Sequence, residues 1–100
     1  MITIQDIVLH SKPHPNMIEG ARQTILKDDN IVLSIVGCAQ GLLYGDFEKD
    51  FEVAILDINS REFVTKYYVS DASDDVLAYQ NSEQVEYIAN LLFKKGFQVG

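Results

Sequence analysis

The chain has 100 residues, of which 47% are hydrophobic and 23% charged, and its formal net charge is −7. This length fits one domain, and the apolar content supports a hydrophobic core and argues against disorder. The sequence has no apolar run of about 18 residues, so we predict that it has no membrane-spanning helix. One cysteine cannot form an intrachain disulfide, and the first ten residues lack the features of a signal peptide, so we expect a cytoplasmic protein.

The acidic residues concentrate in the second half of the chain. Residues 46–86 contain eleven acids and three bases, a net charge of −8, whereas the rest of the chain has a net charge of +1. Affinity for nucleic-acid backbones comes largely from Lys and Arg, so direct nucleic-acid binding is disfavoured. The pattern indicates instead a surface that complements a basic protein.

The N-terminal segment contains two predicted helices. Thr3 is a good N-cap for a short helix over residues 4–10, with Asp6 in its first turn, although the same apolar residues fit a strand. Pro13 and Pro15 interrupt this element. Asn16 then predicts the start of a second helix, with Glu19 as its capping-box partner.

Ile18, Ala21 and Ile25 share one face of this second predicted helix, which should end near residues 28–30. Residues 31–36 form a β-branched apolar run that predicts a buried strand. The glycines that follow it, Gly37, Gly41 and Gly45, indicate a bend or bulge and then a loop. Residues 42–44 are able to continue the strand, and residues 46–50 form a charged turn.

Residues 51–69 are rich in Val, Ile, Phe, Tyr and Thr and predict a β-hairpin. Two registers compete, and a three-residue loop over residues 59–61 separates apolar from polar side chains better than a two-residue loop. That register pairs Phe51 with Val69, Val53 with Tyr67 and Ile55 with Thr65. The opposite face is half apolar and carries Glu52, Glu62 and Lys66.

The last element is a helix that begins at Asn81 or Ser82. Its apolar residues Val85, Ile88, Ala89 and Leu92 recur at helical spacing. We expect Lys94 and Lys95 in its last turn, Gly96 just after its end, and Phe97 and Val99 folded back onto the core. Residues 70–75 should be a loop, and residues 76–79 fit either a helix or a strand.

These elements predict a single α+β domain over residues 1–100, with the order α(α)βββα. A three-stranded antiparallel meander would be flanked by one or two N-terminal helices and by a C-terminal helix, with the helices on one face. The order resembles that of double-stranded-RNA-binding domains in topology alone. The chain lacks the basic patches that such domains need, so their function is not carried over.

Several groups of polar residues have spacings that resemble those of chemical sites. His10 and His14 are four residues apart, but Pro13 separates them. Acids at 46, 48, 50, 52 and 57 match the spacing of a calcium loop, but Phe51 stands where that loop needs glycine. Cys38 follows an apolar strand and fits a buried structural role. We therefore predict no catalytic residue, metal or cofactor, with a metal-binding or enzymatic role of the Asp71, Asp74 and Asp75 loop as one alternative.

The function predicted from these observations is that of a small acidic non-enzymatic binding protein, of the inhibitor or immunity type. It would present an acidic, tyrosine-bearing surface to a basic protein partner, for example a nucleic-acid-binding protein. The predicted contact residues are Asp46, Glu48, Asp50, Glu52, Glu62, Lys66, Tyr68, Asp71, Asp74, Asp75 and Tyr87. A second alternative is a homodimeric accessory domain without a charged partner.

Overall fold

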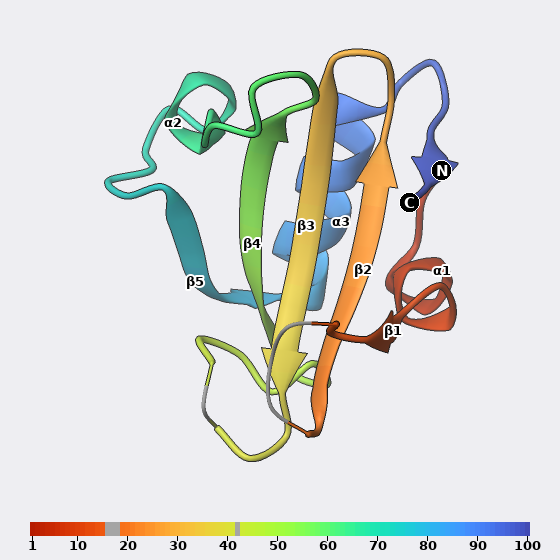
Figure 1. The fold of residues 1–100 in the computed structure, drawn as a ribbon, viewed down its shortest axis with the longest axis vertical. Coiled ribbons are helices and arrows are strands. Elements are labelled where there is room, and N and C mark those ends of the chain that lie inside the picture. Colours follow the sequence, from red (N-terminus) through yellow and green to blue (C-terminus); the bar gives the residue numbers. More distant parts are fainter. Residues whose placement is uncertain (16–18, 42) are drawn as a thin grey trace.

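The computed structural model describes residues 1–15, 19–41 and 43–100, and these form an α+β fold around one antiparallel sheet (Figure 1). The strand order is β1-β2-β3-β4-β5, and β6 pairs with β2 beside β1. The strands are β1 (Lys12–Pro13), β2 (Ala21–Lys27), β3 (Ile31–Cys38), β4 (Asp50–Asp57), β5 (Val76–Asn81) and β6 (Gln98–Val99). The helices are α1 (Ile4–Leu9), α2 (Thr65–Tyr68) and α3 (Ser82–Leu92). The predicted α+β class is confirmed, but a three-stranded meander is too narrow a description.

The short N-terminal helix is confirmed, whereas the second predicted helix is wrong. Thr3 and Asp6 form a capping box at the start of α1. The segment predicted as the second helix forms β2 instead, and Gly20 before it has a positive φ of 93°. This segment is a strand and not a helix because it forms a continuous ladder with β3. The Thr24 hydroxyl also donates to the Ile7 carbonyl of α1 at 2.7 Å. The predicted cap Asn16 lies outside the described residues.

The predicted strand over residues 31–36 is confirmed and extends through Gly37 to Cys38. A Cβ atom on Gly37 would lie 2.5 Å from the backbone nitrogen of Phe47, so the loop after β3 can pack here only because the residue is glycine. The Phe47 ring then meets the ring of Phe51, with centroids 5.2 Å apart. Leu43 and Tyr44 lie in the loop and do not continue the strand, and Leu42 is outside the described residues.

The predicted hairpin over residues 51–69 is wrong in its second half. β4 is a strand, but after the turn only Phe63 pairs with it, opposite Leu56, and the chain then forms α2. Thr65 does meet Ile55, through its side chain. Its hydroxyl accepts from the Ile55 backbone nitrogen at 3.0 Å and donates to the Asp75 carbonyl at 2.6 Å. The side chain takes the place of a ladder partner, so strand pairing stops there.

β5 pairs with β4 along the edge that the predicted hairpin would have covered. Val76 pairs with Ala54 and Leu77 with Val53, and a bulge precedes the next pair. Tyr79 lies in this bulge with a positive φ of 52°, and its backbone nitrogen donates to the Tyr44 carbonyl at 2.8 Å. The uncertain segment at residues 76–79 is therefore a strand, bent toward the loop that follows β3.

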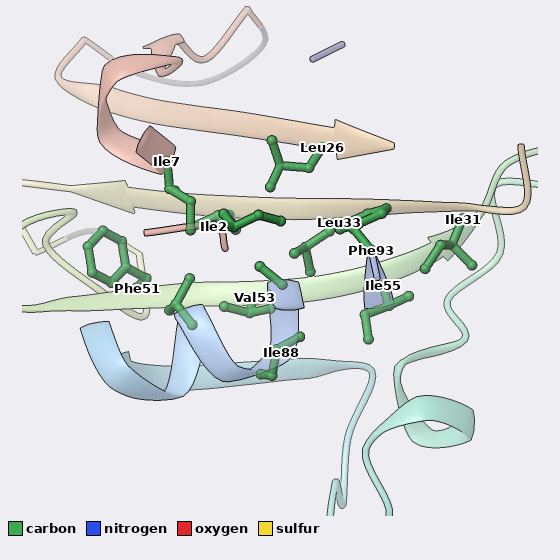
Figure 2. Close-up of a cluster of buried hydrophobic side chains, with 13 residues drawn as sticks. Ile2, Ile7, Leu26, Ile31, Leu33, Phe51, Val53, Ile55, Ile88 and Phe93 are labelled. Carbon is green, nitrogen blue, oxygen red and sulfur yellow. The ribbon is translucent and has the colours of Figure 1, made fainter. Parts of the chain in front are cut away.

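The core lies between the sheet and α3 (Figure 2). Phe51, Val53 and Ile55 of β4 are fully buried, as the alternation of the sequence predicted. On the other half of the predicted hairpin, Phe63 is 49% and Tyr67 is 90% exposed, because Phe63 forms a single isolated bridge with β4 and Tyr67 lies on α2. The remaining core side chains come from β2, β3, both ends of the chain and α3, and they include Leu33, Ile35, Val85 and Ile88.

The C-terminal helix is confirmed, with Asn81 as its N-cap in a capping box with Gln84. It ends at Leu92, so Lys94 and Lys95 lie beyond it and not in its last turn. Phe97 and Val99 were predicted to join the core, but they are 37% and 41% exposed because β6 runs along the edge of β2. Among the described residues, no helix combines the length and apolar sequence that crossing a membrane requires.

Candidate functional site

A groove runs between α3 and the segment that follows α2, on the helical side of the sheet. Its volume is about 810 Å³. One wall comes from residues 68–71, the end from Gln80 and Asn81 of β5, and the other wall from Glu83, Gln84, Tyr87, Ile88 and Leu91 of α3. Among the residues that line it there is no Lys, Arg or His.

The sequence of α3 explains one wall of this groove. The Asn81 cap fixes where the helix begins. Val85, Ile88 and Ala89 then face the core and are at most 5% exposed. Glu83, Tyr87 and Leu91 recur every four residues, which places them one above another on a single helical face. All three are exposed along the groove.

The facing wall is held in position by Thr65. One of its hydrogen bonds fixes α2 against β4 and the other joins α2 to the residue before β5, and Val69, just after α2, packs against the core. The next residues, Ser70 and Asp71, are exposed at the rim of the groove. In this wall Val69 is fixed by the core, and the side chains of Ser70 and Asp71 are exposed to a partner.

The two tyrosines that the sequence favoured as contact residues lie in this one groove. Tyr68 stands at the end of α2 and is 44% exposed, and Tyr87 stands on α3 and is 69% exposed. No described residue forms a hydrogen bond with either hydroxyl. The other three tyrosines, Tyr44, Tyr67 and Tyr79, are also exposed, at 57%, 90% and 60%, and none of them lines the groove.

The carboxylates of Asp71 and Glu83 lie in the same groove and have no hydrogen-bond or ion-pair partner among the described residues. Two smaller depressions, each of about 410 Å³, adjoin the groove and share lining residues with it. One adds Asp74 and the other adds Glu86. Glu86 differs from the rest because its carboxylate accepts from the Ile4 backbone nitrogen at 2.6 Å and holds the N-terminus on α3.

The predicted contact residues at 46–52 lie outside this groove, and most of them stabilise their own loop. Asp46 accepts from the backbone nitrogens of Glu48, Lys49 and Asp50 at 2.8, 2.8 and 3.2 Å. These hydrogen bonds lower the pKa of Asp46. Asp50 accepts from the Asp46 backbone nitrogen and Glu52 from that of Tyr44. Of this set only Glu48 has a carboxylate without a partner among the described residues.

Three further predicted contact residues lie near α2 and also outside the groove. Glu62 and Lys66 are exposed on the turn before α2 and on α2 itself. Asp75 precedes β5, and its carbonyl accepts from Thr65. The structure thus brings together Tyr68, Asp71 and Tyr87, with Asp74 in the adjoining depression, and leaves the other predicted contact residues apart.

Sequence reasoning missed Glu83, Gln80, Gln84 and Leu91 as groove residues. The spacing of Glu83, Tyr87 and Leu91 was a usable signal, because residues four apart share a helical face. No sequence signal joined this face to Asp71, since the opposite wall depends on where α2 forms.

The histidines and the cysteine that the sequence singled out lie outside the groove. His10 ends α1, and the His14 backbone nitrogen donates to the Ala21 carbonyl at 2.9 Å. Cys38 is buried, and its thiol lies 3.4 Å from the Gln40 side-chain oxygen. Within the described ranges, no three or more His, Cys, Asp or Glu side chains are grouped so as to hold a metal ion.

Comparison with protein-family models, with curated proteins and with solved structures finds no match to this chain.

Proposed function

We propose that this protein is a small non-enzymatic binding protein, of the inhibitor or immunity type, that binds a basic protein partner through the groove beside α3. The observation that carries the proposal is the pair of unpartnered carboxylates, Asp71 and Glu83, beside two exposed tyrosines, in a groove without a basic side chain. Opposite charge on a partner would neutralise these carboxylates, and the tyrosine rings would supply apolar contact area.

The net charge of −7 supports the same proposal, because it affects the rate at which a partner approaches. An excess of one sign of charge speeds the approach of an oppositely charged partner and disfavours acidic ones. Exposed carboxylates outside the groove, such as Glu48 and Glu62, contribute to this long-range attraction. Specific affinity would come from the groove, where two carboxylates and two tyrosine rings lie on one concave surface.

The test begins with capture of a basic protein from extract on the immobilised chain, and it is decided by affinities measured with that purified protein. Reversing both groove carboxylates, in Asp71→Lys/Glu83→Lys, should weaken binding by about 100-fold or more, since a repulsive pair replaces an attractive one. The matched control is Glu48→Lys/Glu62→Lys, which changes the net charge by the same amount at exposed positions outside the groove.

The control pair should weaken binding by less than about 10-fold, through loss of long-range attraction alone. Equal losses in the two pairs would mean that only net charge matters, which contradicts a binding role for the groove. Failure to capture any basic protein at low salt would contradict the proposal as a whole.

A further inference from the structure

We propose that the groove recognises an arginine side chain of the partner, with its guanidinium group between the Tyr68 and Tyr87 walls and near Asp71 and Glu83. This inference rests on the function proposed above and names the chemical group that the groove would take. It predicts that a single guanidinium, without the rest of the partner, is bound at this place.

The groove suits the aliphatic part of such a side chain. Val69 is half-buried on one wall, Ile88 is 5% exposed at the base, and Leu91 continues the apolar surface along α3. Arginine and lysine both bury their methylene groups along apolar surface while the charged end stays among polar groups. The apolar base therefore accepts a long basic side chain better than a short polar one.

The polar groups at the rim suit a guanidinium in particular. Guanidinium is planar, carries five N–H donors and stacks on aromatic rings, whereas an ammonium group is compact and strongly hydrated. Acceptors here that have no partner among the described residues include the carboxylates of Asp71 and Glu83 and the two tyrosine hydroxyls. Several acceptors around two rings match a flat group with several donors, and a cation over a tyrosine ring gains about 0.5–2 kcal/mol.

One feature opposes a cation in this groove, because α3 begins there and a helix N-terminus carries about half a positive charge. This effect is partly cancelled, since the Gln84 backbone nitrogen already donates to the Asn81 side chain at 2.9 Å. Two carboxylates carry four times the charge of the helix end, with opposite sign. The residues that line the groove therefore carry a net negative charge that favours a cation. Lys94 lines one of the adjoining depressions and not the groove itself.

The test uses capped pentapeptides with one central residue between glycines, titrated into the isotope-labelled full chain and followed by backbone amide shifts. With arginine at the centre, amides of residues 70–71, 83–84 and 87 should shift, with a dissociation constant on the order of 1 mM. Lysine should bind about three-fold more weakly and citrulline, the uncharged analogue of arginine, at least about ten-fold more weakly.

Variants then locate the contact. Tyr87→Ala and Asp71→Asn should each weaken the arginine peptide by about five-fold or more, whereas Tyr67→Ala, on α2 but outside the groove, should change it by less than about two-fold. Equal shifts with citrulline, or shifts unchanged by Tyr87→Ala, would overturn the inference. Should the peptide fail while a captured partner still responds to Asp71→Lys/Glu83→Lys, the arginine inference is wrong and the proposed function stands.

Discussion

At the residue scale, the acids of this chain fall into two groups that composition does not distinguish. Asp46 and Asp57 accept hydrogen bonds from backbone nitrogens two to four residues ahead and so shape their own turns. Asp71 and Glu83 accept no such bond from the part of the chain that the structure describes. Of the predicted acidic contact residues, Asp46 therefore has a local role in its own turn, and Asp71 is the one that the binding proposal uses together with Glu83.

The turn-forming acids predict how stability depends on pH. The backbone hydrogen bonds lower the pKa of Asp46 and Asp57 in the folded chain below the ordinary value. Their contribution to stability is therefore present above about pH 4 and is lost as the pH falls through the lowered values. Asp46→Asn/Asp57→Asn keeps an acceptor oxygen without a titrating proton, so its stability should fall less steeply on acidification than that of the wild type.

Thermal unfolding followed by circular dichroism at a series of acidic pH values measures this difference. Glu48→Gln, a carboxylate without a partner among the described residues, is the control and should follow the wild-type curve. Identical acid curves for the double variant and the wild type would contradict the role assigned to the two turns.

Thr65 gives a second prediction at this scale. It is fully buried, and its hydroxyl connects the Ile55 nitrogen to the Asp75 carbonyl. Thr65→Val keeps the shape but leaves both backbone groups without this partner, so the free energy of unfolding should fall by about 1–3 kcal/mol. Thr65→Ser keeps the hydroxyl and should cost about 1 kcal/mol or less, the value of one buried methyl group. Urea denaturation measures both, and a serine variant less stable than the valine variant would refute the bridging role.

At the element scale, α3 has two functions on two faces. Val85, Ile88 and Ala89 attach it to the sheet, and Glu83, Tyr87 and Leu91 form a wall of the groove. The helix has an N-terminal capping box, so its start is set locally. Because the core face fixes its rotation, the exposed face is presented in one orientation.

Substitutions on the two faces should therefore behave differently. Ile88→Ala removes a buried side chain and should lower the free energy of unfolding by about 2–5 kcal/mol. Tyr87→Ala removes a side chain that is 69% exposed, and it should change stability by less than about 0.5 kcal/mol. Chemical denaturation of both variants tests the orientation of the helix. A large loss of stability in Tyr87→Ala would show that this ring is structural and unavailable to a partner.

At the scale of the whole molecule, charge and shape act over different distances. The eleven acids of residues 46–86 lie in β4, in α3, and in the loops before β4, before α2 and before β5, whereas only Asp71 and Glu83 line the groove. Attraction by dispersed charges is screened over about 8 Å at physiological salt. It therefore affects the rate of encounter more than the lifetime of a complex.

This separation predicts the salt dependence of binding. Raising the salt concentration from about 50 mM to about 500 mM should slow association with the basic partner by roughly ten-fold or more and change the dissociation rate by less. Surface plasmon resonance measures both rates. An association rate that is independent of salt would exclude steering by the acidic surface.

Local signals in the sequence predicted the parts of the fold that depend on neighbouring residues. The capping patterns at Thr3 and Asn81 located two helices, and the apolar run from residue 31 located β3. The inward face of β4 followed from alternation, since side chains in a strand point to opposite sides. Tyr68 and Tyr87 were identified as contact candidates because tyrosine suits interfaces.

Only the tertiary structure decided the form of β2, the fate of the second half of residues 51–69 and the make-up of the groove. These features depend on pairing between distant segments. The stretch over residues 21–27 fits a helical face, and its ladder with β3 makes it a strand. The local sequence of residues 51–69 favours a hairpin. In the structure, the Thr65 side chain bonds to β4 where a backbone partner would be, and β5 pairs with the edge of β4. Because the chain leaves β4 at Thr65, Tyr68 and Asp71 lie in the groove beside α3. Composition thus determined that the chain is acidic, and local sequence patterns indicated an α+β fold. Long-range hydrogen bonding decided which of its acids and tyrosines line one groove.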